Sequence, residues 1–151
     1  MAASRVTILI VDDDTGHIAL VRRHLRRAGI DNPIDTVNSG QDALDYVART
    51  CVHEQSTSDA GLLVLLDINM PGEIDGIEVL RRLKSEAATQ LIPVVMLTTA
   101  DDPREVDRCY ALGCNVYVTK PVDPSAFMVA IRRLGQFLSV MSVPKYGLRL
   151  T

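Results

Sequence analysis

The sequence has few cysteines, no basic cluster and no long apolar stretch, and each absence excludes a class of protein. Its three cysteines, Cys51, Cys109 and Cys114, form no C-x-x-C pair, so neither a disulfide framework nor a zinc site is indicated. The formal net charge is −3 and no Lys/Arg run occurs, which argues against nucleic-acid binding. No segment approaches the roughly 20 apolar residues that span a bilayer, and the N-terminus lacks a signal-peptide cleavage region. We therefore expect a cytoplasmic protein that contacts neither membrane nor nucleic acid.

The composition of the chain is that of an ordinary globular domain. It has 151 residues, of which 47% are hydrophobic and 23% are charged, and this length can bury one substantial core. We expect one domain over residues 1–138 and a C-terminal tail over residues 139–151. After Lys120 and Pro121 only thirty residues remain, which we take as too few for an output domain.

Short apolar runs alternate with amphipathic helical segments along the chain, a pattern that indicates βαβ units and a parallel sheet. We expect strands at residues 6–11, 34–38, 62–66, 93–97 and 115–118. We expect helices at residues 15–28, 41–50, 76–86 and 103–112, and a last helix from Pro124 to about Val140. The polar stretch from Thr50 to Gly61 is interpreted as a surface loop. The fold class is therefore α/β, a doubly wound, five-stranded parallel sheet with five helices, (βα)5.

Polar residues follow the hydrophobic strands at the points where the strands end. They are Asp12, Asp13, Asp14, Asp67, Thr98 and Lys120. The C-terminal ends of parallel strands lie along one edge of the sheet, where open α/β folds bind ligands. We expect these groups to converge in one cleft, which favours a divalent cation, a phosphoryl group or both.

The carboxylates of this set predict a magnesium site. Mg²⁺ prefers oxygen ligands and usually takes only one or two carboxylates together with water and phosphate. Asp12, Asp13 and Asp67 supply carboxylates, and the Asn69 backbone carbonyl is the expected additional ligand. His17, His24 and His53 are scattered and form neither a metal nor a phosphohistidine pattern, so zinc and copper are disfavoured.

Asp67 is the predicted nucleophile. It stands alone at its strand end before a tight loop, and an aspartate can accept a phosphoryl group as an acyl phosphate. Such transfer depends on positioning and charge compensation. Mg²⁺ and Lys120 are the positive charges expected there, and the Thr98 hydroxyl can donate a hydrogen bond to a phosphoryl oxygen.

These motifs resemble the receiver domain of two-component response regulators. The matching segments, in order, are ILIVDDD, LLDINMPGEIDG, IPVVMLTTA and YVTKP, and the resemblance covers residues 5–138. It implies a flavodoxin-like fold and a single-domain regulator. It also implies that Asp67 is phosphorylated by a phosphohistidine of a sensor kinase, with Mg²⁺ held by Asp12, Asp13, Asp67 and the Asn69 carbonyl.

The resemblance also implies a switch and its direct consequences. Thr98 would follow the phosphoryl oxygen, Lys120 would pair with the phosphate or with Asp67, and Tyr117 would move inward as Thr98 shifts. The Lys120–Pro121 bond is cis in that family, which an X-Pro preference of only about 0.5–1 kcal/mol permits. The chain itself would catalyse nothing beyond its own phosphoryl transfer and dephosphorylation.

The sequence departs from the family pattern at three places. The loop over residues 72–76, GEIDG, is one residue longer than usual, and Thr99 stands where a small residue is more common. The pattern needs only two acids here, so we interpret Asp14 as a helix N-cap or as a first-turn residue stabilised by the helix dipole, a role that Thr15 could share.

Two other classes of function are open alternatives. The run from Asp12 to Gly16 is superficially similar to the opening motif of haloacid-dehalogenase-type phosphatases. Its Thr and Gly are in the opposite order to that motif, however, and no acidic pair follows the strand that ends at Lys120. The second alternative is a pseudo-receiver, an interaction module that is never phosphorylated. A flavodoxin is disfavoured, because the loop after the first strand is acidic.

The end of the chain predicts partners. Apolar residues recur at spacings of three and four, which predicts a helical stripe that forms a homodimer: Phe127, Ala130, Ile131, Leu134, Phe137, Leu138 and Met141. The stretch FLSVMSVP is similar to the tail of receivers that accompany bacterial phytochrome kinases. The expected partners are thus a sensor histidine kinase, of which a phytochrome kinase is the candidate, and a downstream phosphotransfer or effector protein.

Overall fold

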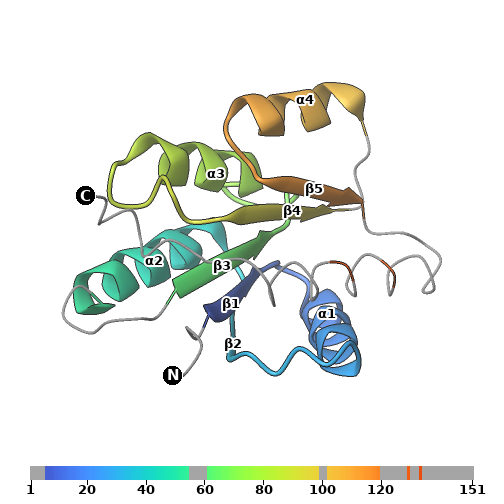
Figure 1. The fold of residues 1–151 in the computed structure, drawn as a ribbon. Coiled ribbons are helices and arrows are strands. Elements are labelled where there is room, and N and C mark those ends of the chain that lie inside the picture. Colours follow the sequence, from blue (N-terminus) through green and yellow to red (C-terminus); the bar gives the residue numbers. More distant parts are fainter. Residues whose placement is uncertain (1–5, 55–60, 99–101, 120–128, 130–132, 134–151) are drawn as a thin grey trace.

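The protein is built on one parallel β-sheet with helices on both faces (Figure 1). The computed structural model describes residues 6–54, 61–98, 102–119, 129 and 133, without the side chains of residues 51–54, 98 and 119. Five strands form the sheet in the order β2-β1-β3-β4-β5: β1 Val6–Val11, β2 Ile34–Val37, β3 Gly61–Leu66, β4 Val94–Thr98 and β5 Val116–Thr119. All pairs are parallel. The predicted doubly wound α/β fold is confirmed.

Four helices connect the strands: α1 Thr15–Arg27, α2 Gly40–Glu54, α3 Gly76–Ser85 and α4 Pro103–Ala111. Pro103 occupies the first turn of α4, where its missing N–H has no partner to lose. Of the predicted last helix only Val129 and Arg133 are described, both in helical conformation, so the extent of that helix lies outside the described residues. None of the helices in the described part is long and apolar enough to cross a bilayer.

The predicted loop from Thr50 to Gly61 is helical in its first part and reaches into β3 at its end, and residues 55–60 between them lie outside the described residues. Helix α2 continues through Glu54, and Gly61 is already the first residue of β3. No glycine or proline interrupts the chain between Gln41 and Ala60, so nothing in the sequence ends the helix at residue 50. The polar composition of this stretch was therefore a poor guide to its conformation.

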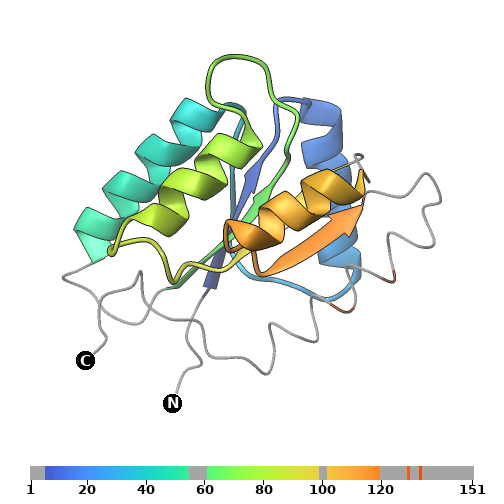
Figure 2. The same ribbon diagram turned by 90° about the horizontal axis from the view of Figure 1, so that it is seen from above.

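Alternate residues along the strands face two separate cores. One core lies under α2 and α3 and the other under α1, and these helices cover opposite faces of the sheet (Figure 2). Leu9 and Val11 of β1 pack in the core shared with α2, α3 and Cys109 of α4. Ile8 and Ile10 pack on the other face, with Val21 and Leu25 of α1 among their neighbours. All six residues of β3 are buried, as its continuous apolar run predicted. Each fully buried aliphatic side chain contributes on the order of 2 kcal/mol, which makes the central strands rigid supports.

Glycines in the left-handed region end α1 and α4 where the sequence predicted. Gly29 has φ 85° and Gly113 has φ 104°. Cys114 follows the second of these turns, and its N–H donates to the Cys109 carbonyl at 3.0 Å. Both cysteines are free and buried, and burial raises the pKa of the Cys109 thiol to about 11. Both cysteines pack in the core shared with α2 and α3.

Candidate functional site

Strand register brings the predicted acidic residues together at one edge of the sheet. Val11 of β1 pairs with Leu66 of β3, so Asp12 and Asp67 leave neighbouring strands side by side. The Asp67 N–H donates to the Val11 carbonyl at 3.0 Å, which extends the pairing to the site itself. In the strand order 2-1-3-4-5, the junction of β1 and β3 is the topological switch point, where such sheets bind their ligands.

Three carboxylates converge at this junction. One oxygen from each of Asp12, Asp13 and Asp67 lies within 4.8 Å of the other two. Asp12 and Asp67 are 3% and 8% exposed, whereas Asp13 is exposed to solvent. Like charges so close, and two of them buried, repel unless a cation lies between them. Two oxygens on one Mg²⁺ are about 3–4 Å apart for bonds near 2.1 Å, so the donors fit this ion after small side-chain adjustments.

Hydrogen bonds fix the orientation of the two buried carboxylates. Asp12 Oδ1 accepts the Asp14 N–H at 3.0 Å. Asp67 Oδ1 accepts the Asn69 N–H at 3.4 Å, and Asn69 itself is exposed. The loop after β3 thereby stays close to the carboxylates, with the Asn69 backbone beside Asp67. Its carbonyl remains a proposed ligand.

The loop between β3 and α3 packs so tightly that two positions require glycine. A Cβ on Gly76 would lie 1.9 Å from the Asp67 carbonyl oxygen, and a Cβ on Gly40 would lie 2.2 Å from that of Ile74. The Gly76 N–H donates to the Ile68 carbonyl at 3.0 Å. These approaches hold the loop, including the additional residue inferred at 72–76, against Asp67 and the start of α2.

The first turn of α1 adds two side chains to the rim of the site. Asp14 is the N-cap, because its Oδ1 accepts the N–H groups of Gly16 at 2.8 Å and His17 at 3.2 Å, as predicted. The His17 ring lies between two aspartates, with Nδ1 3.6 Å from Asp12 Oδ2 and Nε2 3.7 Å from Asp14 Oδ2. The sequence did not predict this placement of His17, and the group of possible metal ligands among the described residues does not include it. One feature of the sequence could have predicted this placement: His17 lies in the first turn of a predicted helix, directly after a strand that ends in acidic residues.

The remaining predicted residues lie at the same edge or outside the described residues. Thr98 is the last residue of β4, and its backbone pairs with Thr119 of β5. Thr99, Lys120 and the Lys120–Pro121 bond lie outside the described residues. The convergence of Thr98 and Lys120 on Asp67 therefore stays a prediction.

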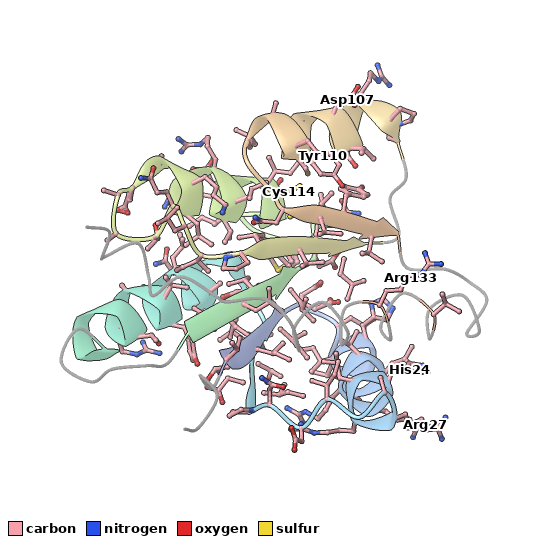
Figure 3. The ribbon with its side chains drawn as sticks, viewed as in Figure 1. His24, Arg27, Asp107, Tyr110, Cys114 and Arg133 are labelled. Atoms are coloured by element: carbon pink, nitrogen blue, oxygen red, sulfur yellow. The ribbon has the colours of Figure 1, made fainter. Side chains whose placement is uncertain are left out.

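Tyr117, the predicted switch aromatic, is half-buried in β5 and packs against the core on the α4 face. Its N–H donates to the Tyr110 hydroxyl at 3.1 Å. Tyr110 reaches from α4 toward β5 (Figure 3), so the two tyrosines connect that helix to the edge strand. Movement of Tyr117 between two positions stays a prediction.

Comparison with known proteins assigns a family to these features. The family model described as "Response regulator receiver domain" matches residues 8–132. A response regulator receiver domain from Rhodospirillum rubrum has a crystal structure similar to this one, with 45% identity and a TM-score of 0.81, covering 93% of this chain and 98% of that one.

Two cyanobacterial proteins are also similar. The phosphorylated cyanobacterial phytochrome response regulator RcpA is 30% identical with a TM-score of 0.78, covering 93% of this chain and 99% of its own. Response regulator Rcp1 of Synechocystis is 34% identical over 113 residues, which is 75% of either chain. Its Mn²⁺-bound structure superposes with a TM-score of 0.76 at 29% identity, covering 91% of this chain and 98% of that one.

Proposed function

The chain belongs to the family of response regulator receiver domains, and from this premise we propose that Asp67 is its phosphoacceptor in a Mg²⁺-dependent reaction. Phosphoryl acceptance on an aspartate is the function of this family. The observation that carries the assignment is the convergence of Asp67 with Asp12 and Asp13 at the sheet's switch point. Asp67 is the member of this group that follows the central strand β3, which is buried along its whole length.

The chemistry at Asp67 is an in-line displacement. A carboxylate oxygen of Asp67 attacks the phosphorus of a phosphohistidine, the new P–O bond forms as the P–N bond breaks, and the departing imidazole nitrogen takes up a proton. Asp12, Asp13, Asp67 and the Asn69 carbonyl would hold Mg²⁺, which would supply positive charge to compensate that of the phosphoryl group. Thr98 donates a hydrogen bond to one of these oxygens, and Lys120 pairs with another.

The signal leaves the site through β4, β5 and α4. As Thr98 follows the phosphoryl oxygen, Tyr117 moves inward, and the bond from its N–H to the Tyr110 hydroxyl at 3.1 Å supports a connection of this movement to α4. The surface of α4 and β5 is then the part of the described protein that changes on phosphorylation. The chain transfers phosphate only onto and off itself.

The expected partners follow from this function. A sensor histidine kinase supplies the phosphoryl group in the cytoplasm, and a phytochrome kinase is the candidate, supported by the similarity to RcpA. A phosphotransfer or effector protein receives the signal. The apolar stripe of the last helix and the tail of residues 139–151 form a homodimer.

The test is the variant Asp67→Asn, compared with Asp75→Asn. Asp75 caps α3 by accepting the Glu78 N–H at 2.9 Å. Because Asn also caps helices well, Asp75→Asn should keep the fold while it removes one negative charge, as Asp67→Asn does. With a small phosphodonor and Mg²⁺, intact-mass spectrometry should show one added phosphoryl group on the wild type and on Asp75→Asn, and none on Asp67→Asn.

Other outcomes identify the alternatives. Equal phosphorylation of Asp67→Asn contradicts the assignment of the acceptor. A wild-type protein that gains no phosphoryl group from small donors or from kinases is the pseudo-receiver. If the protein hydrolyses a generic phosphomonoester over many turnovers, it acts as the haloacid-dehalogenase-type phosphatase, an alternative that the family match does not support.

A further inference from the structure

Helix α4 shares less of the core than α1 and α3 do. Among the residues that the structure describes, α4 buries only Cys109, whereas α1 buries four residues and α3 buries five. An element with few buried side chains is displaced at a lower free-energy cost than one that forms the core. Each polar contact between α4 and the sheet therefore contributes a larger share of what holds this helix in place.

Tyr110 makes one such contact. The residue is 49% exposed, but its side chain extends from α4 toward β5 (Figure 3), and its hydroxyl accepts the Tyr117 N–H at 3.1 Å. Strand β5 lies at the edge of the described sheet, next to β4. The hydrogen bond thus connects an exposed helix to the backbone of the edge strand.

A row of paired residues leads from the acidic site to this hydrogen bond. Leu66, which directly precedes Asp67, pairs with Met96 of β4, and Met96 pairs with Tyr117 of β5. Leu66 and Met96 are fully buried, and Tyr117 packs against the same core. Close-packed neighbours pass a displacement on, because little free volume is present to absorb it. One packed row therefore connects Asp67 to the strand residue that Tyr110 binds.

We propose that Tyr110 is a positioning residue of the phosphorylation switch: its hydroxyl holds α4 against β5, and α4 moves after phosphorylation of Asp67 only when this hydrogen bond breaks. The proposal rests on the proposed function, in which the signal leaves the site through β4, β5 and α4. It adds to that function the residue that opposes the movement and so sets how readily the chain is phosphorylated.

The hydrogen bond and the phosphoryl group are linked in both directions. A bond that exists in only one arrangement shifts the equilibrium towards that arrangement, so the Tyr110 hydroxyl disfavours the arrangement of the phosphorylated chain. By linkage, phosphorylation of Asp67 weakens the bond by the same free energy. Tyr110→Phe keeps the ring and removes only the acceptor, so it should make phosphorylation faster. A purely structural role of Tyr110 predicts no such gain in rate.

The first experiment measures the hydrogen bond itself. Nuclear magnetic resonance should show that hydrogen exchange at the Tyr117 amide is faster in folded Tyr110→Phe than in the wild type, because the amide has lost this acceptor. Tyr46→Phe is the matched control. The Tyr46 hydroxyl of α2 donates to Asp35 Oδ2 of β2 at 2.6 Å, at the opposite edge of the sheet, so its loss should leave exchange at the Tyr117 amide unchanged.

The second experiment measures the switch. Wild type, Tyr110→Phe and Tyr46→Phe are incubated with acetyl phosphate and Mg²⁺, and intact-mass spectrometry follows phosphorylation over time. Loss of a hydrogen bond of ordinary strength should raise the rate in Tyr110→Phe about threefold or more, and Tyr46→Phe should react as the wild type does. In the phosphorylated wild type, exchange at the Tyr117 amide should become faster, as linkage requires.

The outcomes separate this proposal from the proposed function. If Tyr110→Phe is phosphorylated on Asp67 no faster than the wild type, the proposed function stands and the role of Tyr110 is overturned. Unchanged exchange at the Tyr117 amide, or a Tyr46→Phe variant that reacts as fast as Tyr110→Phe, overturns that role too. If none of the three proteins is phosphorylated, the proposed function fails, and the switch role of Tyr110 fails with it.

Discussion

Gly76 shows how a single residue without a side chain determines the position of Asp67, the proposed phosphoacceptor. A Cβ at this position would lie 1.9 Å from the Asp67 carbonyl oxygen and 2.7 Å from the Ile68 Cα. Both contacts are backbone atoms of the segment that carries Asp67, so they cannot rotate away. The fold of this protein therefore depends here on close backbone approach rather than on an unusual φ.

We predict that Gly76→Ala displaces the loop that carries Asp67. The free energy of unfolding should fall by at least about 2 kcal/mol, as for other overpacked sites, and phosphorylation by a small phosphodonor should slow. Urea unfolding and intact-mass time courses measure the two effects. Gly16→Ala is the control, because its nearest atom is a side-chain oxygen at 3.1 Å and alanine favours the helix. Unchanged stability in Gly76→Ala contradicts the close approach.

His24 makes the stability of the protein depend on pH. It is a buried residue of α1, near Arg27 (Figure 3). Burial lowers the pKa of His24 below its ordinary value of 6.5, and Arg27 and Arg23 lower it further. Well above pH 6.5, His24 is neutral in both the folded and the unfolded protein. As the pH falls below 6.5, His24 takes up a proton in the unfolded chain but stays neutral in the folded protein, so the free energy of unfolding falls.

The variant His24→Gln should therefore lose less stability on acidification than the wild type does. The free energy of unfolding is measured by urea titration at about pH 7.5 and about pH 5.5, and the difference between the two values is compared. His53→Gln is the control and should retain the wild-type difference. If His24→Gln and the wild type lose the same amount, the lowered pKa of His24 is wrong.

At the scale of elements, Lys84 joins the end of α3 to the beginnings of β4 and β5. Its Nζ donates to the carbonyls of Gln90 at 3.0 Å and Ile92 at 2.7 Å, and lies 3.4 Å from Asn115 Oδ1. Asn115 Oδ1 also accepts the Val94 N–H at 2.9 Å. One ammonium group thus holds together three segments at the edge opposite the carboxylates, and its partial burial lowers the pKa of Lys84.

Replacing Lys84 with Met should destabilise the fold by about 1–3 kcal/mol, because two carbonyls lose a donor in a half-buried position. Mg²⁺ affinity should not change, since the site lies at the other end of the strands. Arg82→Met is the matched control on the same helix: Arg82 is exposed and pairs with Glu78, and such surface pairs contribute little. If Lys84→Met and Arg82→Met lower the melting temperature equally, Lys84 contributes no more to stability than an exposed charged residue does.

At the scale of the molecule, we predict that the assembly state depends on the C-terminal tail. The apolar stripe from Phe127 to Met141 is longer than one domain needs to cover its sheet, and an apolar surface left uncovered usually marks an interface. We predict a homodimer that residues 139–151 stabilise.

Deletion of residues 139–151 should shift the protein from dimer to monomer in sedimentation or light-scattering measurements, with the phosphorylation of Asp67 retained. The comparison is made with and without a phosphodonor, because phosphorylation changes the neighbouring surface in the proposed mechanism. A full-length protein that is monomeric at high concentration in both states rules out the dimer.

Much of the architecture was predictable because it depends on local pattern. Alternating apolar strands and amphipathic helices predicted five parallel strands and the first four helices, since each element must bury an apolar face. Asp14 was recognisable as a cap, and Gly29 and Gly113 as helix stops, because these roles depend only on adjacent residues. The end of α2 was missed, because polar composition does not end a helix without Gly or Pro.

The sequence by itself determined which strand ends carry carboxylates, and hence the class of chemistry, because motif order and the rules of parallel sheets suffice for that. Only the tertiary structure decided the distances: the register of β1 with β3 that brings Asp12 and Asp13 to Asp67, and the backbone contact at Gly76. These two features are set by the packing of the whole core and by no local pattern, whereas the place of His17 beside Asp12 and Asp14 follows from the first turn of α1.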